Sequence, residues 1–202
     1  MNSTRLALIT VVPTALLVML AGCAAPVAAT TGTTAPSVTQ NTDSTAGPHN
    51  EADATFAQMM VIHHEGAIEM ATLAEKNGTS SEVRSLAARI RAAQGPEIDQ
   101  MRGWLKAWGE PAPEDSDMAG MGHDGMEMGG LDQQAAMDEL MKLGGEAFDK
   151  TFLTLMIQHH QGALTMANQE VTNGENTEAV ALAKVIIAAQ QKEIAEMQAL
   201  LK

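Results

Sequence analysis

Apolar and small residues recur three and four positions apart in two long stretches of the chain, and each stretch predicts a pair of α-helices. In the first stretch the pattern starts near Asp53, breaks at Asn77-Gly78 and continues to Leu105. The two predicted stripes are Phe56, Met59, Met60, His63, Gly66, Ala67 and Met70, followed by Leu86, Ile90, Ala93, Gln94, Glu97, Ile98, Met101 and Leu105. Strand-like alternation is absent, so the pattern predicts an all-α fold.

Local signals mark where these helices should stop and start. Asn77-Gly78 is typical of a left-handed helix stop, and Thr79 followed by Glu82 is typical of a capping box that opens the next helix. Gly95-Pro96 predicts a kink or a loosening inside the second helix. A short extra helix is expected over residues 132–143, before Gly144-Gly145.

The same hairpin occurs twice. Residues 53–105 align on residues 149–201 without a gap, and 23 of 53 positions are identical. The second copy has Asn173-Gly174 as its turn. One hairpin cannot bury its apolar face alone, so the duplication predicts a four-helix bundle over residues 51–202.

The N-terminus has the layout of an export signal. Arg5 precedes an apolar run of 16 residues that ends before Cys23, too short for a stable membrane span. We interpret residues 1–22 as a signal peptide and residues 23–50 as a flexible tether, rich in Ala, Thr, Ser, Gly and Pro. The context of Cys23 is that of a lipidated cysteine, although a lone thiol can also be an inert buried residue. The prediction is an extracytoplasmic protein anchored to the membrane by lipid, on the periplasmic or cell-surface face.

Charge narrows the range of partners. The formal net charge is −13, which disfavours nucleic acid, attracts cations and predicts no nucleic-acid partner. A single cysteine cannot form an internal disulfide, so the core and any bound metal must hold the domain together.

A pair of adjacent histidines in each copy is the first candidate metal site. Neighbouring helical residues diverge by about 100°, so the two members of a pair should face different ways. We expect the duplication to bring His63 close to His159, with carboxylates and thioethers on the facing helices. The candidate ligands are His63, His64, His159, His160, Met60 and Met156, with Glu97, Glu193, Met101 and Met197 around them. Alternatively, each inward histidine forms a buried pair with a glutamate and the methionines only fill the core.

The linker at residues 109–130 is the second candidate. Its soft or imidazole donors are Met118, Met121, His123, Met126 and Met128. The segment is too rich in glycine for a packed helix, so core packing does not explain its methionines. Uncharged thioether sulfur suits Cu(I) and Ag(I) better than harder divalent ions. A linker whose methionine content is accidental is the competing interpretation.

The pattern F-x-x-x-M-x-x-H-H-x-G-A-x-x-M-A, read from Phe56 to Ala71 and from Phe152 to Ala167, resembles the bacterial family called domain of unknown function 305. The later Q-x-x-E-I-x-x-M elements, from Gln94 and from Gln190, extend the resemblance over residues 51–202. The resemblance implies a ferritin-like helical bundle and, because some members are implicated in copper binding, a soft-metal site. A di-iron centre is not implied, because the sequence contains no Glu-x-x-His pair.

The leading hypothesis is therefore a non-catalytic lipoprotein that binds Cu(I), or Ag(I), for sequestration, homeostasis or resistance. A helical adaptor or scaffold with structural His-Glu pairs is the alternative. No nucleophile triad, phosphate-binding loop or cysteine pair supports an enzyme. Neither a homo-oligomer nor a copper-handling partner protein is decided by the sequence.

Overall fold

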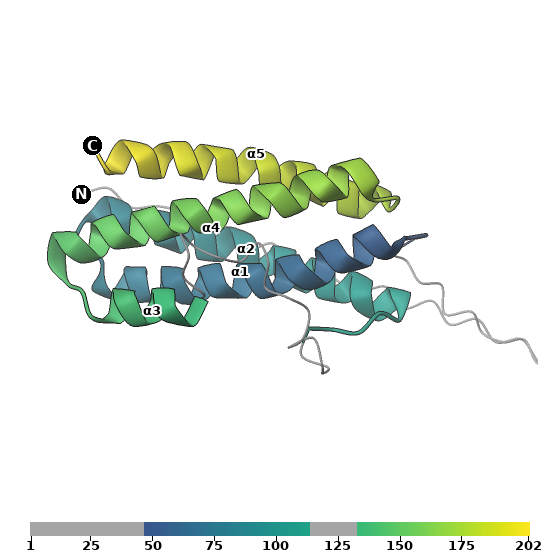
Figure 1. Ribbon diagram of the computed structural model, residues 1–202, viewed down its shortest axis with the longest axis horizontal. Helices are drawn as coiled ribbons and strands as arrows, with labels where there is room; N and C mark the ends of the chain where they lie inside the picture. Colours follow the sequence, from purple (N-terminus) through teal and green to yellow (C-terminus); the bar gives the residue numbers. More distant parts are fainter. Residues whose placement is uncertain (1–46, 114–132) are drawn as a thin grey trace, which may run out of the picture. The chain divides into compact units, whose positions relative to one another are not determined.

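The structure is a computed structural model, and the residues described are 47–113 and 133–202. This part contains five helices and no strand (Figure 1): α1 (Glu51–Asn77), α2 (Ser81–Trp108), α3 (Gln133–Met141), α4 (Gly145–Asn173) and α5 (Thr177–Leu200). Helices α1 and α2 form one hairpin, α4 and α5 form the other, and α1 packs against α4 between them. The predicted four-helix bundle of two hairpins with a short extra helix is confirmed. None of the described helices has the length and hydropathy needed to cross a membrane.

Two hydrophobic clusters fill the bundle, one toward each end. Phe152 lies in a cluster with Leu86 and Ile90 of the first hairpin, and α3 adds its buried Leu140. The equivalent Phe56 lies in the other cluster, which includes residues of α4 and α5. Equivalent phenylalanines thus occupy opposite clusters, which is the arrangement of two copies related by a pseudo-two-fold axis.

The turns inside the hairpins differ from their predicted form. Gly78 has φ −58° and Gly174 has φ −69°, so neither turn uses the left-handed conformation that Asn-Gly predicts. Glycine is needed there for space instead, because a Cβ on Gly78 would lie 2.6 Å from the Ala74 carbonyl oxygen. The capping-box prediction was also wrong by one residue: Ser80, rather than Thr79, caps α2 and accepts a hydrogen bond from Val83 N at 3.1 Å.

Each hairpin turn is fastened by an aspartate of the other hairpin. The Asp149 carboxylate of α4 accepts hydrogen bonds from Thr79 N and Ser80 N, both at 2.8 Å. The equivalent Asp53 of α1 accepts from Glu175 N at 3.2 Å and from Asn176 N at 2.9 Å. These bonds use backbone donors that no helix satisfies, so the two copies hold each other's turns.

Helix α2 continues through Pro96 from Ser81 to Trp108. Proline has no backbone N–H, so the Ala92 carbonyl lacks its hydrogen bond within the helix. Pro96 and Ala92 are both exposed, so water can donate a hydrogen bond to that carbonyl. The Gly95-Pro96 step is therefore accommodated on the solvent side without interrupting the helix.

Candidate metal centre

The structure brings His63 of α1 and His159 of α4 together in the middle of the bundle. Their ring centroids are 3.6 Å apart and the rings are tilted by 42°. The two residues are only 2% and 4% exposed, respectively. The contact lies where the two hairpins meet, so neither hairpin could form it alone.

The second histidine of each pair faces its own hairpin. His64 Nε2 lies 2.8 Å from Glu97 Oε2, and His160 Nε2 lies 2.7 Å from Glu193 Oε2. Both histidines are fully buried. Adjacent side chains diverge on a helix, but α1 and α4 each have a neighbouring helix on two sides. All four imidazoles are buried for that reason.

Burial keeps the central pair of histidines neutral. It lowers the pKa of His63 and of His159 well below the usual value, and the neighbouring histidines lower both further. A neutral imidazole has one bare nitrogen, which is the form that binds a metal. The central pair is therefore ready to donate lone pairs at neutral pH.

One ring nitrogen of each of the four histidines lacks a protein partner. The Nδ1 atoms of all four are buried and make no hydrogen bond within the described part of the chain. Because a carboxylate only accepts, Nε2 of His64 and of His160 donates to its glutamate, and Nδ1 is the ring nitrogen left without a partner. A carboxylate that holds the far nitrogen of a histidine is the usual support of a metal-binding imidazole.

The stripe methionines are buried as well. Met60, Met101, Met156 and Met197 are completely inaccessible to solvent. Each belongs to one of the two hydrophobic clusters, so core packing accounts for their burial. Their thioether groups nevertheless provide soft donors in the same interior.

Two glutamines were missed as site residues by the sequence analysis. Gln94 and Gln190 are equivalent in the repeat, each is 3% exposed, and the Oε1 atom of each has no hydrogen-bond partner among the described residues. Gln94 lies one helical turn before Glu97, and Gln190 lies one turn before Glu193, the two glutamates that contact a histidine. The repeated Q-x-x-E spacing was the signal that could have identified them.

The predicted donors do not form one compact chelate. No group of three or more His, Cys, Asp or Glu side chains within residues 47–113 and 133–202 is placed to hold a metal ion. Glu97 and Glu193 bind histidine rather than a shared centre. The linker candidates and the lipidation candidate lie outside the described residues: Met118, Met121, His123, Met126, Met128 and Cys23.

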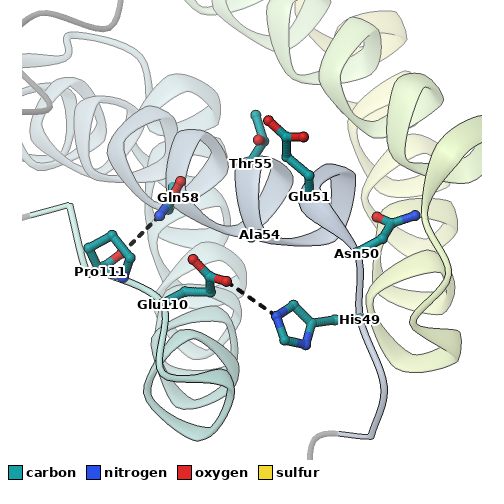
Figure 2. A pocket seen from close by; sticks show the side chains of 8 residues that line it. All are labelled: His49, Asn50, Glu51, Ala54, Thr55, Gln58, Glu110 and Pro111. Atoms are coloured by element: carbon teal, nitrogen blue, oxygen red, sulfur yellow. Dashed lines mark hydrogen bonds and ion pairs between the residues drawn. The ribbon is translucent and has the colours of Figure 1, made fainter.

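A cleft of about 440 Å³ lies where the described chain enters α1 and leaves α2 (Figure 2). His49 stacks on Trp108 with ring centroids 4.5 Å apart, and its Nε2 lies 3.4 Å from Glu110 Oε1. Gln58 donates a hydrogen bond to the Pro111 carbonyl at 3.0 Å. The last residues of the predicted tether therefore contact the bundle.

Comparison with known proteins gives a consistent result. The family described as "Domain of unknown function (DUF305)" matches residues 53–201. A DUF305 fragment from Deinococcus radiodurans is 31% identical, with a TM-score of 0.67, over 77% of this chain and 98% of that one. A DUF305 protein from Streptomyces coelicolor, described as secreted, is 35% identical, with a TM-score of 0.64, over 74% and 91%. No curated protein matches the sequence.

The protein CopM is a further structural relative. Its Cu(II)-bound form is 35% identical to this chain, with a TM-score of 0.62, over 74% of this chain and 95% of CopM. CopM has also been solved in Cu(I)-bound and silver-bound forms. The family match spans both copies of the hairpin and the structural matches span the bundle, so the chain belongs to the DUF305 family.

Proposed function

We propose that this protein binds a soft monovalent ion, Cu(I) or Ag(I), between the paired histidines of its bundle, without catalysing a reaction. The role is sequestration or homeostasis of the ion outside the cytoplasm, and thereby resistance to it. The single observation that carries the proposal is the set of four buried Nδ1 atoms without hydrogen-bond partners in the described residues. Buried polar atoms are normally satisfied, so four in one layer indicate a missing partner.

The electrostatics favour a soft ion of low charge. His63 and His159 are neutral, and each of the two carboxylates beside the other histidines, Glu97 and Glu193, already accepts a hydrogen bond from a histidine Nε2. A divalent ion prefers several charged or hard donors, and the described residues gather no such group. Cu(I) and Ag(I) accept few ligands and bind imidazole and thioether well.

The relatives support the same ion class. CopM has been solved with Cu(I), with Cu(II) and with silver. The similarity to this chain extends over almost the whole length of CopM. We infer that the ion reaches the bundle after capture by the thioethers of Met118, Met121, Met126 and Met128.

The same proposal includes the location of the protein. An export signal, a lipid on Cys23 and a tether would place the bundle beyond the membrane, where a cysteine-free donor set resists oxidation to disulfides. The Streptomyces relative described as secreted supports an extracytoplasmic location.

The test is an anaerobic titration of the purified protein with Cu(I) against a coloured Cu(I) chelator. We expect the wild-type protein to withdraw Cu(I) from the chelator and the double variant H64A/H160A to lose most of that capacity. His49→Ala is the matched control, because this histidine lies outside the bundle core and should leave binding unchanged. Circular dichroism verifies that each variant is folded. Wild-type protein that does not compete with the chelator would refute the proposal.

Two further results separate the sites and the alternative function. Leucine at the four linker methionines should slow Cu(I) uptake and leave final occupancy unchanged if the linker only captures the ion. The scaffold alternative is favoured by the His64–Glu97 and His160–Glu193 hydrogen bonds, which are also what a purely structural pair would show. Under that alternative Cu(I) leaves the melting temperature unchanged, whereas a bound ion raises it.

A further inference from the structure

Glu170, near the end of α4, is a buried carboxyl group that the proposed metal site does not use. It is only 1% exposed, and neither of its oxygen atoms has a hydrogen-bond donor in the described part of the chain. Its counterpart in the first copy is Ala74. Because burying an unpartnered carboxylate is costly, the side chain requires an explanation.

Asp53 of α1 lies beside it. A Cβ on Gly174 would come within 2.8 Å of Asp53 Oδ1 and would overlap Glu170 Oε1, so both carboxyl groups border the same glycine. Asp53 accepts hydrogen bonds from the backbone N–H groups of Asn50, Glu175 and Asn176. These three donors hold Asp53 in its ionised form, and they lower its pKa although burial alone would raise it.

Two ionised carboxylates cannot bond to each other, because both are acceptors. If Glu170 carries a proton, its O–H can donate to Asp53 and the pair is satisfied. We propose that Glu170 and Asp53 share a proton that fastens the start of α1 to the turn between α4 and α5, so that proton loss loosens this end of the bundle. The inference is independent of metal binding.

The surroundings of the pair agree with a neutral Glu170. Burial first, and then the hydrogen bond and the negative charge of Asp53, raise the pKa of Glu170 to about 8. The carbonyl end of α4 adds negative potential. Other carboxylates at this end are exposed: Glu51 at the start of α1, Glu175 in the turn, and Glu178 of α5, which accepts a hydrogen bond from Trp104 Nε1 of α2.

The first copy provides an internal control. Asp149 fastens the turn at Thr79 and Ser80 as Asp53 fastens the turn at Glu175 and Asn176, but Ala74 replaces the second carboxyl group. The turn between α1 and α2 should therefore not respond to pH in this range. Only the turn between α4 and α5 should do so.

The global test compares wild-type protein with Glu170→Gln, which keeps the shape and the donor but cannot ionise. The pKa of Glu170 is about 8 in the folded protein, against an ordinary value of 4.5, so the contribution of Glu170 to stability is complete below pH 4.5 and is lost as the pH rises to 8. The wild-type unfolding equilibrium constant should rise about tenfold per pH unit relative to E170Q between pH 5 and 8, then level off. Parallel pH profiles for the two proteins would overturn the proposal.

The local test follows hydrogen exchange of backbone amides as protection factors, which remove the intrinsic effect of pH. Protection of the Glu175 and Asn176 amides should fall between pH 5 and 8 and level off above pH 8, while protection at Thr79 and Ser80 stays constant. In Glu170→Ala, which introduces the residue found at the equivalent position of the first hairpin, amide protection at both turns should not change with pH. Equal loss at both turns in the wild-type protein would mean general loosening and would also overturn the proposal.

Discussion

The imidazole rings of His63 and His159 contact each other across the α1–α4 packing surface, at a centroid distance of 3.6 Å. They are equivalent residues of two copies, so the contact lies on the pseudo-two-fold axis of the bundle. Each copy contributes one half of a layer that also contains His64 and His160. A single hairpin has the residues but not the site, which explains why the duplication matters for the proposed function.

The carboxylates that hold His64 and His160 should be needed for metal affinity as well as for the fold. Glu97→Gln replaces a charged acceptor with an amide and removes the constraint that puts the proton on His64 Nε2. We expect the affinity for Cu(I) to fall about 10- to 100-fold, as is typical for the supporting partner of a ligand. Chelator competition measures the change.

Glu75→Gln is the control for that experiment. Glu75 pairs with Arg91 at the surface of the first hairpin, outside the histidine layer. Its replacement should leave affinity for Cu(I) unchanged. Equal affinity in the wild type, E97Q and E75Q would show that the carboxylate has a structural role only.

Acidification should destabilise the bundle through His63 and His159. Their pKa values are well below 6.5 in the folded protein, so both are neutral there while the unfolded chain takes up protons below about pH 6.5. Their contribution to stability is therefore complete above pH 6.5 and is lost as the pH falls. The expected loss is up to about 1.4 kcal/mol per pH unit for each histidine.

Glu170 acts in the opposite direction over the same range, so the histidine effect is best measured in E170Q. In E170Q, the free energy of unfolding measured with urea should rise with pH between pH 5 and 6.5. The slope of this rise should become smaller when H63Q and H159Q are added to E170Q. Unchanged slopes would mean that the two imidazoles accept protons in the folded state.

Two glycine-to-alanine changes should have opposite effects. Gly103 is an exposed residue inside α2 with no atom near its missing Cβ, so Gly103→Ala should stabilise the protein by about 0.5–1 kcal/mol. Gly78→Ala puts a Cβ 2.6 Å from the Ala74 carbonyl oxygen and should cost roughly 1–3 kcal/mol. Urea denaturation at fixed pH measures both. A neutral Gly78→Ala would show that the turn can shift to make room.

The sequence by itself determined the helices, the positions of the turns between them and the bundle, but not the conformation of the turns. The spacing of apolar residues from Phe56 to Met70 is a local property of one helix, and the repeat at residues 149–201 required a second helical face for burial. The short extra helix could also be predicted from the sequence, because its apolar residues are close neighbours along the chain. Closeness of His63 to His159 followed from duplication alone.

Only the tertiary structure decided which partner each side chain meets. Contacts between helices depend on how far each helix is rotated about its axis and shifted along its neighbour. Examples are the hydrogen bond between Glu97 and His64, the hydrogen bond from Ser80 N to Asp149, and the pairing of Asp53 with Glu170. Rotation and shift are set by the sum of many packing contacts between residues far apart in sequence. The period of a single helix contains no information about them, so the donors could be named from the sequence but not joined into sites.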